Sequence, residues 1–327
     1  MKDFKHDLIT VNGIEIHYVE QGSGPLVLLC HGFPESWYSW RHQIPALASA
    51  GYRAVALDMR GYGQTSQPAE IEAYGLSSLV GDVVQAVSVL GEEQSVIVGH
   101  DWGGPVAWYA ALMRPDVFRA VVSLSVPYNP PLSLPDGITL NDVMRQVAGD
   151  RDYYRLFFQE PGVAEADLEA DIRKTMLGLL YSISGDIVRD GVHSIGWDGH
   201  FTKGETLTDQ LVIPDELPPW LSEEDLTFYI DEITRSGFRG GINWYRNIKN
   251  MTSILAPFVG CPLNQPSLYL YGEYDLIAGN SAEAIEALPS RLGNLQGLYK
   301  LEGAGHWLQQ ERPEEVNRAL IKFLDNL

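Results

Sequence analysis

The sequence contains very little cysteine and no export signal. Cys30 and Cys261 are the two cysteines in 327 residues, and neither belongs to a CxxC pair. Two cysteines are too few for a disulfide framework, which favours a reducing compartment. The N-terminal stretch MKDFKHDLIT lacks the apolar core of a signal peptide. We therefore expect a cytoplasmic protein.

Long apolar runs and positive charge are also scarce. No stretch approaches the ~20 apolar residues that a membrane span needs, so we expect none. Lys and Arg number 23 against 43 Asp and Glu, a net charge of -20, which disfavours nucleic-acid and anionic membrane partners. The eight histidines form no HExxH pattern, and we predict no metal and no cofactor. His31 and His100 flank turns and are interpreted as structural.

Apolar strands alternate with helices in the first part of the chain. LITVNGIEIHYVE alternates around Asn12-Gly13, a favoured two-residue turn of a β-hairpin. Four continuous apolar runs follow, with helical segments such as LSSLVGDVVQAVSVLG between them: PLVLLCHG, YRAVALDMRGYG, SVIVGHD and AVVSLSVP. Such runs are typical of a mostly parallel sheet with helices on both faces, so we predict an α/β fold.

The pattern changes at residue 130. A Pro-rich loop precedes three segments that favour helices with no strand between them: DYYRLFFQE, DLEADIRKTMLGLLYSI and EEDLTFYIDEITRSGF. Strands return with PSLYLYGEYD and GLYKLEGAGHW, and PEEVNRALIKFLDNL favours a final helix. We predict an α/β core made of residues 1–129 and 251–327, with a helical cap inserted at residues 130–250.

Chemistry-bearing residues follow three of the predicted strands. GHDWG has the small-x-nucleophile-x-small spacing of a nucleophile elbow, with Asp101 at its centre. Asp275 follows the strand of PSLYLYGEYD, and His306 follows the last strand. Ligands of such sheets bind at the carboxyl ends of the strands, and this chain order of nucleophile, acid and histidine is that of the α/β-hydrolases. We predict that the three residues form a catalytic triad.

Each of the three also has a simpler interpretation. Asp101 could cap the helix that follows it, Asp275 could form a turn, and His306 could be a surface histidine. Three suitable residue types at three strand ends in the expected order favour the triad over these separate roles. Residues 120–130 contain no Asp or Glu, so no other acid follows the strand AVVSLSVP.

Longer motifs give the chain a family resemblance. HGFPESWYSWRHQIPALASAGYRAVALDMRGYGQTS, GHDWGG, YRLFFQEPGVAEADLE, FRGGINWYRN and GAGHW resemble the soluble epoxide hydrolases of the α/β-hydrolase fold, of plant and bacterial type, over nearly the whole sequence. The resemblance implies that the backbone N–H groups of Phe33 and Trp102 form an oxyanion hole and that the Phe33-Pro34 bond is cis. It also implies that Tyr154 and Tyr245 hang from the cap over the nucleophile.

Two details follow from matching these motifs. The family's tyrosine lies five residues before the Gln of FQEPG, here Gln159, which selects Tyr154 rather than its neighbour Tyr153. GYGQT, residues 61–65, matches a turn-forming loop of the family. Because it has no third glycine, it is not a dinucleotide fingerprint, and we interpret it as structural.

An aspartate at the elbow suits the implied reaction. Its carboxylate is ionised at pH 7, attacks an epoxide carbon without a base and forms an alkyl ester. His306, oriented by Asp275, then activates a water that hydrolyses the ester to a vicinal diol, whereas a serine would give a stable ether. A tyrosine donates the proton that the leaving alkoxide needs. The expected partner is a small apolar epoxide, and the resemblance implies a role in detoxification.

Two alternatives stay open. A haloalkane dehalogenase shares the fold, the aspartate and a tryptophan at Trp102, but such relatives typically carry Asn or a second Trp after HG, where this chain has Phe33. A catalytically silent α/β-hydrolase would bind a small apolar ligand under its cap, and such proteins often lose part of the triad. The sequence leaves the oligomeric state open, with a homodimer among the alternatives.

Overall fold

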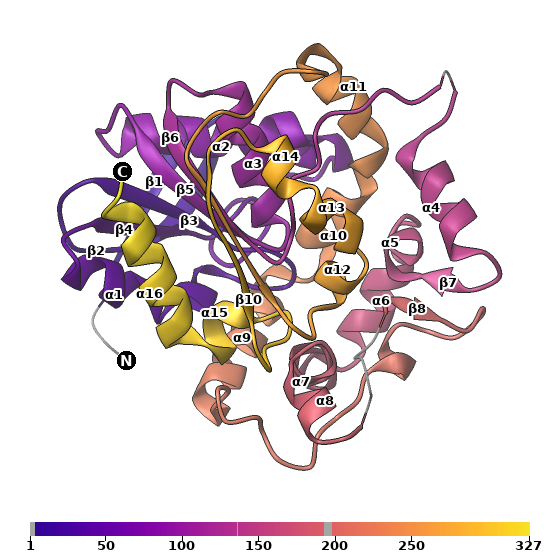
Figure 1. The fold of residues 1–327 in the computed structure, drawn as a ribbon. Helices are drawn as coiled ribbons and strands as arrows, with labels where there is room; N and C mark the ends of the chain where they lie inside the picture. Colours follow the sequence, from indigo (N-terminus) through magenta and orange to yellow (C-terminus); the bar gives the residue numbers. More distant parts are fainter. Residues whose placement is uncertain (1–3, 136, 193–197) are drawn as a thin grey trace.

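The structure is a computed structural model that describes residues 4–135, 137–192 and 198–327. An 8-stranded sheet in the order β1-β2-β4-β3-β5-β6-β9-β10 is covered by helices on both faces (Figure 1). The strands are β1 Lys5–Val11, β2 Ile14–Gln21, β3 Leu26–Cys30, β4 Arg53–Leu57, β5 Ser95–His100, β6 Phe118–Leu124, β9 Ser267–Gly272 and β10 Leu295–Leu301. β2 runs antiparallel to both of its neighbours, and every neighbouring pair from β4 to β10 is parallel. The predicted α/β fold is confirmed.

The N-terminal hairpin turns where the sequence predicts. Val11 pairs with Ile14, and the two residues between them have φ values of 48° at Asn12 and 77° at Gly13. A tight two-residue turn needs positive φ at both positions, and Asn and Gly adopt it most readily.

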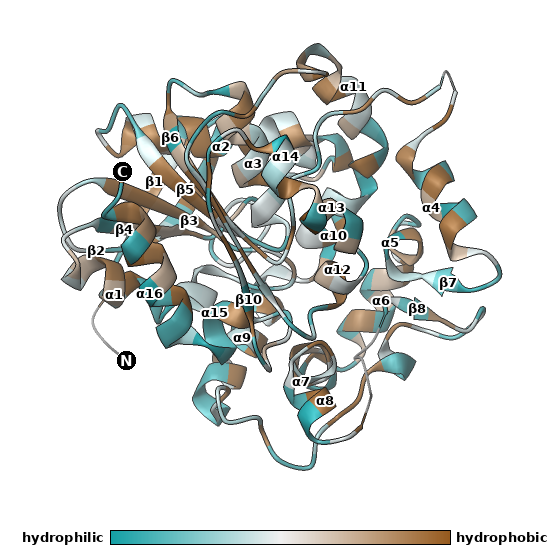
Figure 2. Ribbon diagram, in the orientation of Figure 1, coloured by the Kyte–Doolittle hydropathy of each residue, from teal (hydrophilic) through white to brown (hydrophobic). Residues whose placement is uncertain are grey.

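Two layers of helices enclose the sheet. On one face, α1 (Gln43–Ser49) packs against α16 (Pro313–Leu324), and on the other α2 (Leu76–Val89) packs against α3 (Gly103–Met113) (Figure 1). The central strands are almost entirely buried between these layers and are brown along most of their length in Figure 2. Burial on both faces explains why these strands show continuous rather than alternating apolar residues.

The segment between β6 and β9, here called the cap region, is mainly helical. α4 to α8 gather together at one end of the sheet (Figure 1). Its helices are α4 Leu140–Ala148, α5 Tyr154–Phe157, α6 Val163–Glu169, α7 Ile172–Ser182, α8 Asp186–Arg189, α9 Glu223–Ser236, α10 Arg239–Arg246 and α11 Met251–Leu255. The domain boundaries at residues 130 and 250 stay predictions.

Two local expectations for the cap region are wrong. It contains a ribbon of two short antiparallel strands, β7 (Asp152–Tyr153) and β8 (His200–Phe201), where we expected helices alone. Local sequence favours helix there, but pairing with a distant segment holds residue 153 in an extended conformation. The helix expected over DLEADIRKTMLGLLYSI is divided because Asp171 is extended and caps α7, its side chain accepting from Lys174 N.

The remaining short helices complete the chain. They are α12 Leu276–Gly279, α13 Ala282–Glu286, α14 Leu288–Arg291 and α15 Leu308–Glu311, with 3-10 turns at Trp37–Trp40, Ile71–Tyr74, Thr208–Gln210, Ile248–Asn250 and Ala256–Phe258. Within the three described ranges, no helix is both long and apolar enough to cross a bilayer. The same ranges contain no group of three or more His, Cys, Asp or Glu side chains placed to bind a metal ion.

The GYGQT loop fastens the cap region to the core. A Cβ added to Gly240 of α10 would lie 2.2 Å from the carbonyl oxygen of Gly61, so only glycine allows this approach. Beside it, Trp244 Nε1 donates to the carbonyl oxygen of Arg60 at 3.0 Å. These contacts support the structural interpretation of the loop.

Candidate active site

Asp101 stands at the turn between β5 and α3. Its φ is 49°, a left-handed conformation that is strained by about 1–3 kcal/mol outside glycine. The turn is also crowded, since a Cβ added to Gly99 would lie 2.0 Å from Gly103 O and one added to Gly103 would lie 2.1 Å from Cys30 O. The glycines of GHDWG therefore permit a sharp elbow that presents the Asp101 side chain at the carboxyl end of the sheet.

The loop after β3 holds one oxygen of the Asp101 carboxylate. Phe33 N donates to Asp101 Oδ1 at 2.8 Å, and the Phe33-Pro34 peptide bond is cis, as the resemblance implies. His31 stiffens this loop, because its Nδ1 donates to Gly32 O at 2.8 Å and its Nε2 lies 3.0 Å from the N–H of Met59. The structural interpretation of His31 agrees with these contacts.

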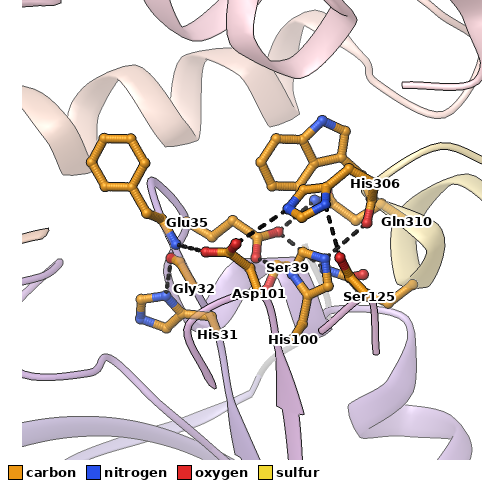
Figure 3. Close-up of polar contacts among 12 residues, drawn as sticks. His31, Gly32, Glu35, Ser39, His100, Asp101, Ser125, His306 and Gln310 are labelled. Atoms are coloured by element: carbon orange, nitrogen blue, oxygen red, sulfur yellow. Dashed lines mark hydrogen bonds and ion pairs between the residues drawn. The ribbon is translucent and has the colours of Figure 1, made fainter. Parts of the chain in front are cut away.

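The three residues of the predicted triad lie together. His306 Nε2 is 3.6 Å from Asp101 Oδ2, and His306 Nδ1 is 3.0 Å from Asp275 Oδ1 (Figure 3 shows His306 beside Asp101). Asp275 begins α12, where its Oδ1 also accepts from Ile277 N at 2.9 Å. All three triad side chains are buried. The structure thus joins residues from three separate strand ends.

Opposite charges set the protonation of this triad. Burial lowers the pKa of His306, but the carboxylates of Asp275 and Asp101 outweigh it and raise that pKa to about 10. Burial raises the pKa of the Asp101 and Asp275 carboxyls, but the interactions with His306 lower these pKa values by a larger amount. Both pKa values therefore lie below the usual range. These shifts favour an imidazolium between two carboxylates in the resting site.

Ser125 is a neighbour of the triad that our sequence reasoning missed. It follows β6 at a φ of 73°, and its Oγ lies 3.1 Å from His306 Nδ1 (Figure 3). Its carbonyl oxygen accepts from the Tyr269 hydroxyl at 2.7 Å. Ser125 is not an acid, and the sequence prediction for this strand end concerned acids alone. A search for any polar residue there would have found Ser125.

A buried polar network also contacts the backbone of His306. His100 Nε2 donates to the carbonyl oxygen of His306 at 2.8 Å, and His100 Nδ1 lies 2.7 Å from Glu35 Oε2. Glu35 Oε1 accepts from Gln309 Nε2 at 3.1 Å and from Gln310 Nε2 at 3.0 Å. The structural interpretation of His100 is incomplete, because this residue contacts the backbone of the candidate base.

Glu311 fixes the loop that carries His306. Its Oε2 accepts from Gly305 N and Gly185 N, both at 2.9 Å, and its Oε1 accepts from Trp307 N at 3.1 Å. Burial raises the pKa of this carboxyl to about 7. Two of these donors flank His306, so Glu311 sets the path of the backbone on both sides of it. No sequence motif had indicated this role.

Two cavities meet above Asp101. The larger is about 330 Å³ and the smaller about 40 Å³, and Asp101, Tyr154 and Tyr245 line both. The two tyrosine rings are 5.8 Å apart at an angle of 74°. Burial raises the pKa of both phenols, so each keeps its proton. Among the described residues, those that line the two cavities do not include Tyr153. The Tyr153 ring instead stacks on the His200 ring, with 4.6 Å between the ring centroids.

Aromatic rings surround this site. The Trp102 ring lines the larger cavity and contacts Tyr245 edge-on at 5.1 Å, and the Phe33 ring contacts Tyr245 at 5.5 Å. Trp102 precedes α3 directly, next to Asp101 in the chain. The Phe33 N–H points at the nucleophile, whereas the backbone role of Trp102 stays a prediction.

Comparisons with known proteins identify the family of this chain. Residues 25–177 match the family described as alpha/beta hydrolase fold. The chain is 41% identical to epoxide hydrolase B of Mycobacterium tuberculosis over 98% of each chain. A solved epoxide hydrolase from an endophytic Streptomyces superposes with a TM-score of 0.94 and 46% identity, over 99% of this chain and 96% of that one. Epoxide hydrolase A of Mycobacterium thermoresistibile gives a TM-score of 0.90 and 40% identity, over 99% and 98%.

Proposed function

Since this chain belongs to the epoxide hydrolases of the α/β-hydrolase fold, we propose that it converts small apolar epoxides to vicinal diols through an ester on Asp101. One observation carries the mechanism. A buried carboxylate paired with His306 lies beneath two buried phenols, Tyr154 and Tyr245, at the meeting point of both cavities. We place the reaction in the cytoplasm, as the sequence predicts.

The two oxygens of Asp101 have different tasks. Oδ1 is held by the Phe33 N–H, so Oδ2 attacks the epoxide carbon and becomes the ester oxygen. When water then attacks Cγ, negative charge develops on Oδ1. The N–H groups of Phe33 and Trp102 stabilise this oxyanion, as in other acyl-transfer sites.

The tyrosines supply the proton for ring opening. Arg155 Nε donates to the Tyr154 hydroxyl at 2.9 Å. Because a guanidinium can only donate, the phenol oxygen accepts this bond and its own hydrogen points elsewhere. We assign that hydrogen to the epoxide oxygen, with Tyr245 as a second donor. The phenols stay protonated at neutral pH, so they can act as acids when the carbon–oxygen bond breaks.

His306 changes its role after the first step. Esterification removes the charge of Asp101, one of the two carboxylates that raise the pKa of His306. The imidazolium then loses its proton, which restores the phenol that protonated the alkoxide. The neutral His306 takes one proton from water, and the resulting hydroxide attacks Cγ of the ester. The second proton of that water passes to the departing alkoxide, so the diol leaves with the Asp101 carboxylate and the imidazolium restored. Protons and oxygen atoms balance over the cycle.

A single turnover in water enriched in heavy oxygen tests the mechanism. With enzyme in excess over styrene oxide, we expect the label in the Asp101 carboxylate and not in the first diol. Heavy oxygen in that first diol would mean that water opens the ring directly, and the covalent mechanism would be wrong. The dehalogenase alternative predicts release of halide from haloalkanes. We expect the enzyme that hydrolyses styrene oxide to release no halide.

A further inference from the structure

Arg155 is a cation inside the candidate site. It belongs to α5, follows Tyr154 directly and lines the larger cavity together with Asp101 and Tyr245. Its Nε donates to the Tyr154 hydroxyl at 2.9 Å, and its guanidinium carbon lies 5.5 Å from the centroid of that ring. The guanidinium is therefore one hydrogen bond away from the proposed proton donor.

Arg155 is half-buried and differs in its partners from the buried arginines Arg41, Arg60 and Arg246. Those arginines have a carboxylate within hydrogen-bond distance: Arg41 with Asp225 at 3.0 Å, Arg60 with Asp82 at 2.6 Å and Arg246 with Glu165 at 2.7 Å. In the described part of the chain, Arg155 has no carboxylate within 4.0 Å, and its two Nη groups bond to no protein atom. Leaving a cation in an aromatic pocket without a counter-charge is unfavourable, so a ligand that brings one would gain affinity.

We propose that Arg155 binds a carboxylate of the substrate, and that the preferred substrates are short epoxy acids whose carboxylate lies within about three bonds of the ring. This inference rests on the proposed function. Planar guanidinium and carboxylate groups match in a two-bond pair, for which both Nη groups of Arg155 are available.

The required distance follows from Tyr154. An epoxide oxygen bonded to the Tyr154 hydroxyl lies about 2.8 Å from it, and Arg155 Nε lies 2.9 Å from the same atom. The oxirane and the guanidinium thus share one hydrogen-bonding group. When the carboxylate is near the ring, it can bind Arg155 while the epoxide oxygen binds the Tyr154 hydroxyl. A carboxylate at the far end of a long chain cannot do so.

The residues around the cavity determine where the carboxylate and the apolar group of the epoxy acid bind. Asp101 repels an anion, so the carboxylate belongs on the cap side with Arg155. An aryl or alkyl group fits the rest of the larger cavity, which Trp102, Pro105, Trp108 and Leu255 line. The cavity of about 330 Å³ has room for a molecule of this size.

Matched substrates test the assignment. We compare trans-phenylglycidate with trans-phenylglycidamide, which has the same shape and no charge, in the parent, Arg155→Gln and Arg145→Gln. Arg145 is the control because it is an exposed cation of α4 whose loss changes the net charge equally. We expect the parent to favour the acid in kcat/KM. The ratio of acid to amide should fall about 10- to 100-fold in Arg155→Gln and stay constant in Arg145→Gln.

The ratio separates recognition from effects on Tyr154. Loss of Arg155 also removes a hydrogen bond from the proton donor, so both substrates should react more slowly in Arg155→Gln. An equal loss on acid and amide would overturn the inference, as would a parent that favours the amide. Such an equal loss would leave the ratio of acid to amide in Arg155→Gln the same as in the parent.

A binding experiment keeps the inference apart from the proposed function. Calorimetry measures the binding of cinnamate and cinnamamide, which lack the oxirane. It needs no turnover, and it uses the parent protein alone, so it does not depend on whether a variant folds. We expect the parent to bind cinnamate about 10-fold more tightly, and equal or weaker binding of cinnamate would overturn the inference. Failure to hydrolyse styrene oxide would instead contradict the proposed function, whatever the calorimetry shows.

Discussion

The two sides of the cavity are built differently. On the core side, Asp101, Asp275 and His306 end strands or follow them, and each is fixed by backbone hydrogen bonds or buried partners. On the cap side, Tyr154 and Tyr245 belong to short helices and are surrounded mainly by aromatic rings. In the proposed mechanism, the core side thus supplies the groups that form and hydrolyse the ester, and the cap side supplies phenols that stay protonated.

This difference separates two tasks. In the proposed mechanism, the core side forms and hydrolyses the ester whatever the substrate, because its reacting atoms belong to the protein. In the same mechanism, the cap side contacts the leaving oxygen and its substituents, so we expect a change of one residue there to alter which epoxide reacts. Variants of the two sides should therefore fail at different steps.

The largest loss is expected on the core side at the nucleophile. Asp101→Asn keeps the shape and tolerates the positive φ at the elbow, but an amide cannot form the ester. We expect kcat on styrene oxide to fall by about 10⁴-fold or more, with no covalent adduct by intact mass. An adduct on the folded variant would show that another residue is the nucleophile.

His306→Gln should stop the reaction one step later. We expect ring opening once per enzyme molecule, so that intact mass rises by one substrate while steady-state turnover falls about 10³- to 10⁴-fold. Asp275→Asn should slow the same hydrolysis less completely, because it orients His306 and does not transfer the proton. A folded His306→Gln protein that forms no adduct would mean that His306 also serves the first step.

The tyrosines sharpen the comparison from the cap side. Removing both hydroxyls should slow alkylation about 10²- to 10⁴-fold, as measured by single-turnover kinetics, with ester hydrolysis less affected. Each single variant should lose less than the pair. Tyr154→Phe should lose more than Tyr245→Phe, because Arg155 polarises the Tyr154 hydroxyl. Alkylation at the parent rate in the double variant would exclude both phenols as donors.

Glu311 offers a test of the core side that does not depend on substrate. Glu311→Gln replaces one acceptor oxygen by a donor facing backbone N–H groups. We expect the free energy of unfolding in urea to fall by about 1–3 kcal/mol and kcat to fall with it. Glu314→Gln, at an exposed position of α16, is the matched control. An unchanged stability would mean that these bonds are not needed to hold the His306 loop.

The last test is a pH dependence of stability. The pKa of His306 is raised in the fold to about 10 from its usual 6.5, so its contribution is complete below pH 6.5 and is lost as pH rises through about 10. Over this range, unfolding in urea should show a steeper loss of stability in the parent than in His306→Gln. Parallel curves would indicate that the imidazolium does not persist in the folded resting enzyme.

Local sequence was sufficient for much of the core side. Continuous apolar runs predicted the buried strands, and the glycines around Asp101 predicted the elbow because a tight turn needs them. The positions of Asp275 and His306 followed from strand order alone, since parallel strands bring their carboxyl ends to one edge. The tyrosines came only from resemblance, as nothing local distinguishes two phenols among 16.

Tertiary structure decided the rest. The β7–β8 ribbon, the bond from Ser125 to His306 and the bonds from Glu311 to the His306 loop each depend on partners distant in the chain. So does the lack of a carboxylate partner for Arg155 among the described residues. Periodicity and short motifs report what neighbouring residues do to one another. Whether a buried charge has a counter-charge depends on which distant side chains the fold brings within a few ångströms, and no local pattern encodes that distance.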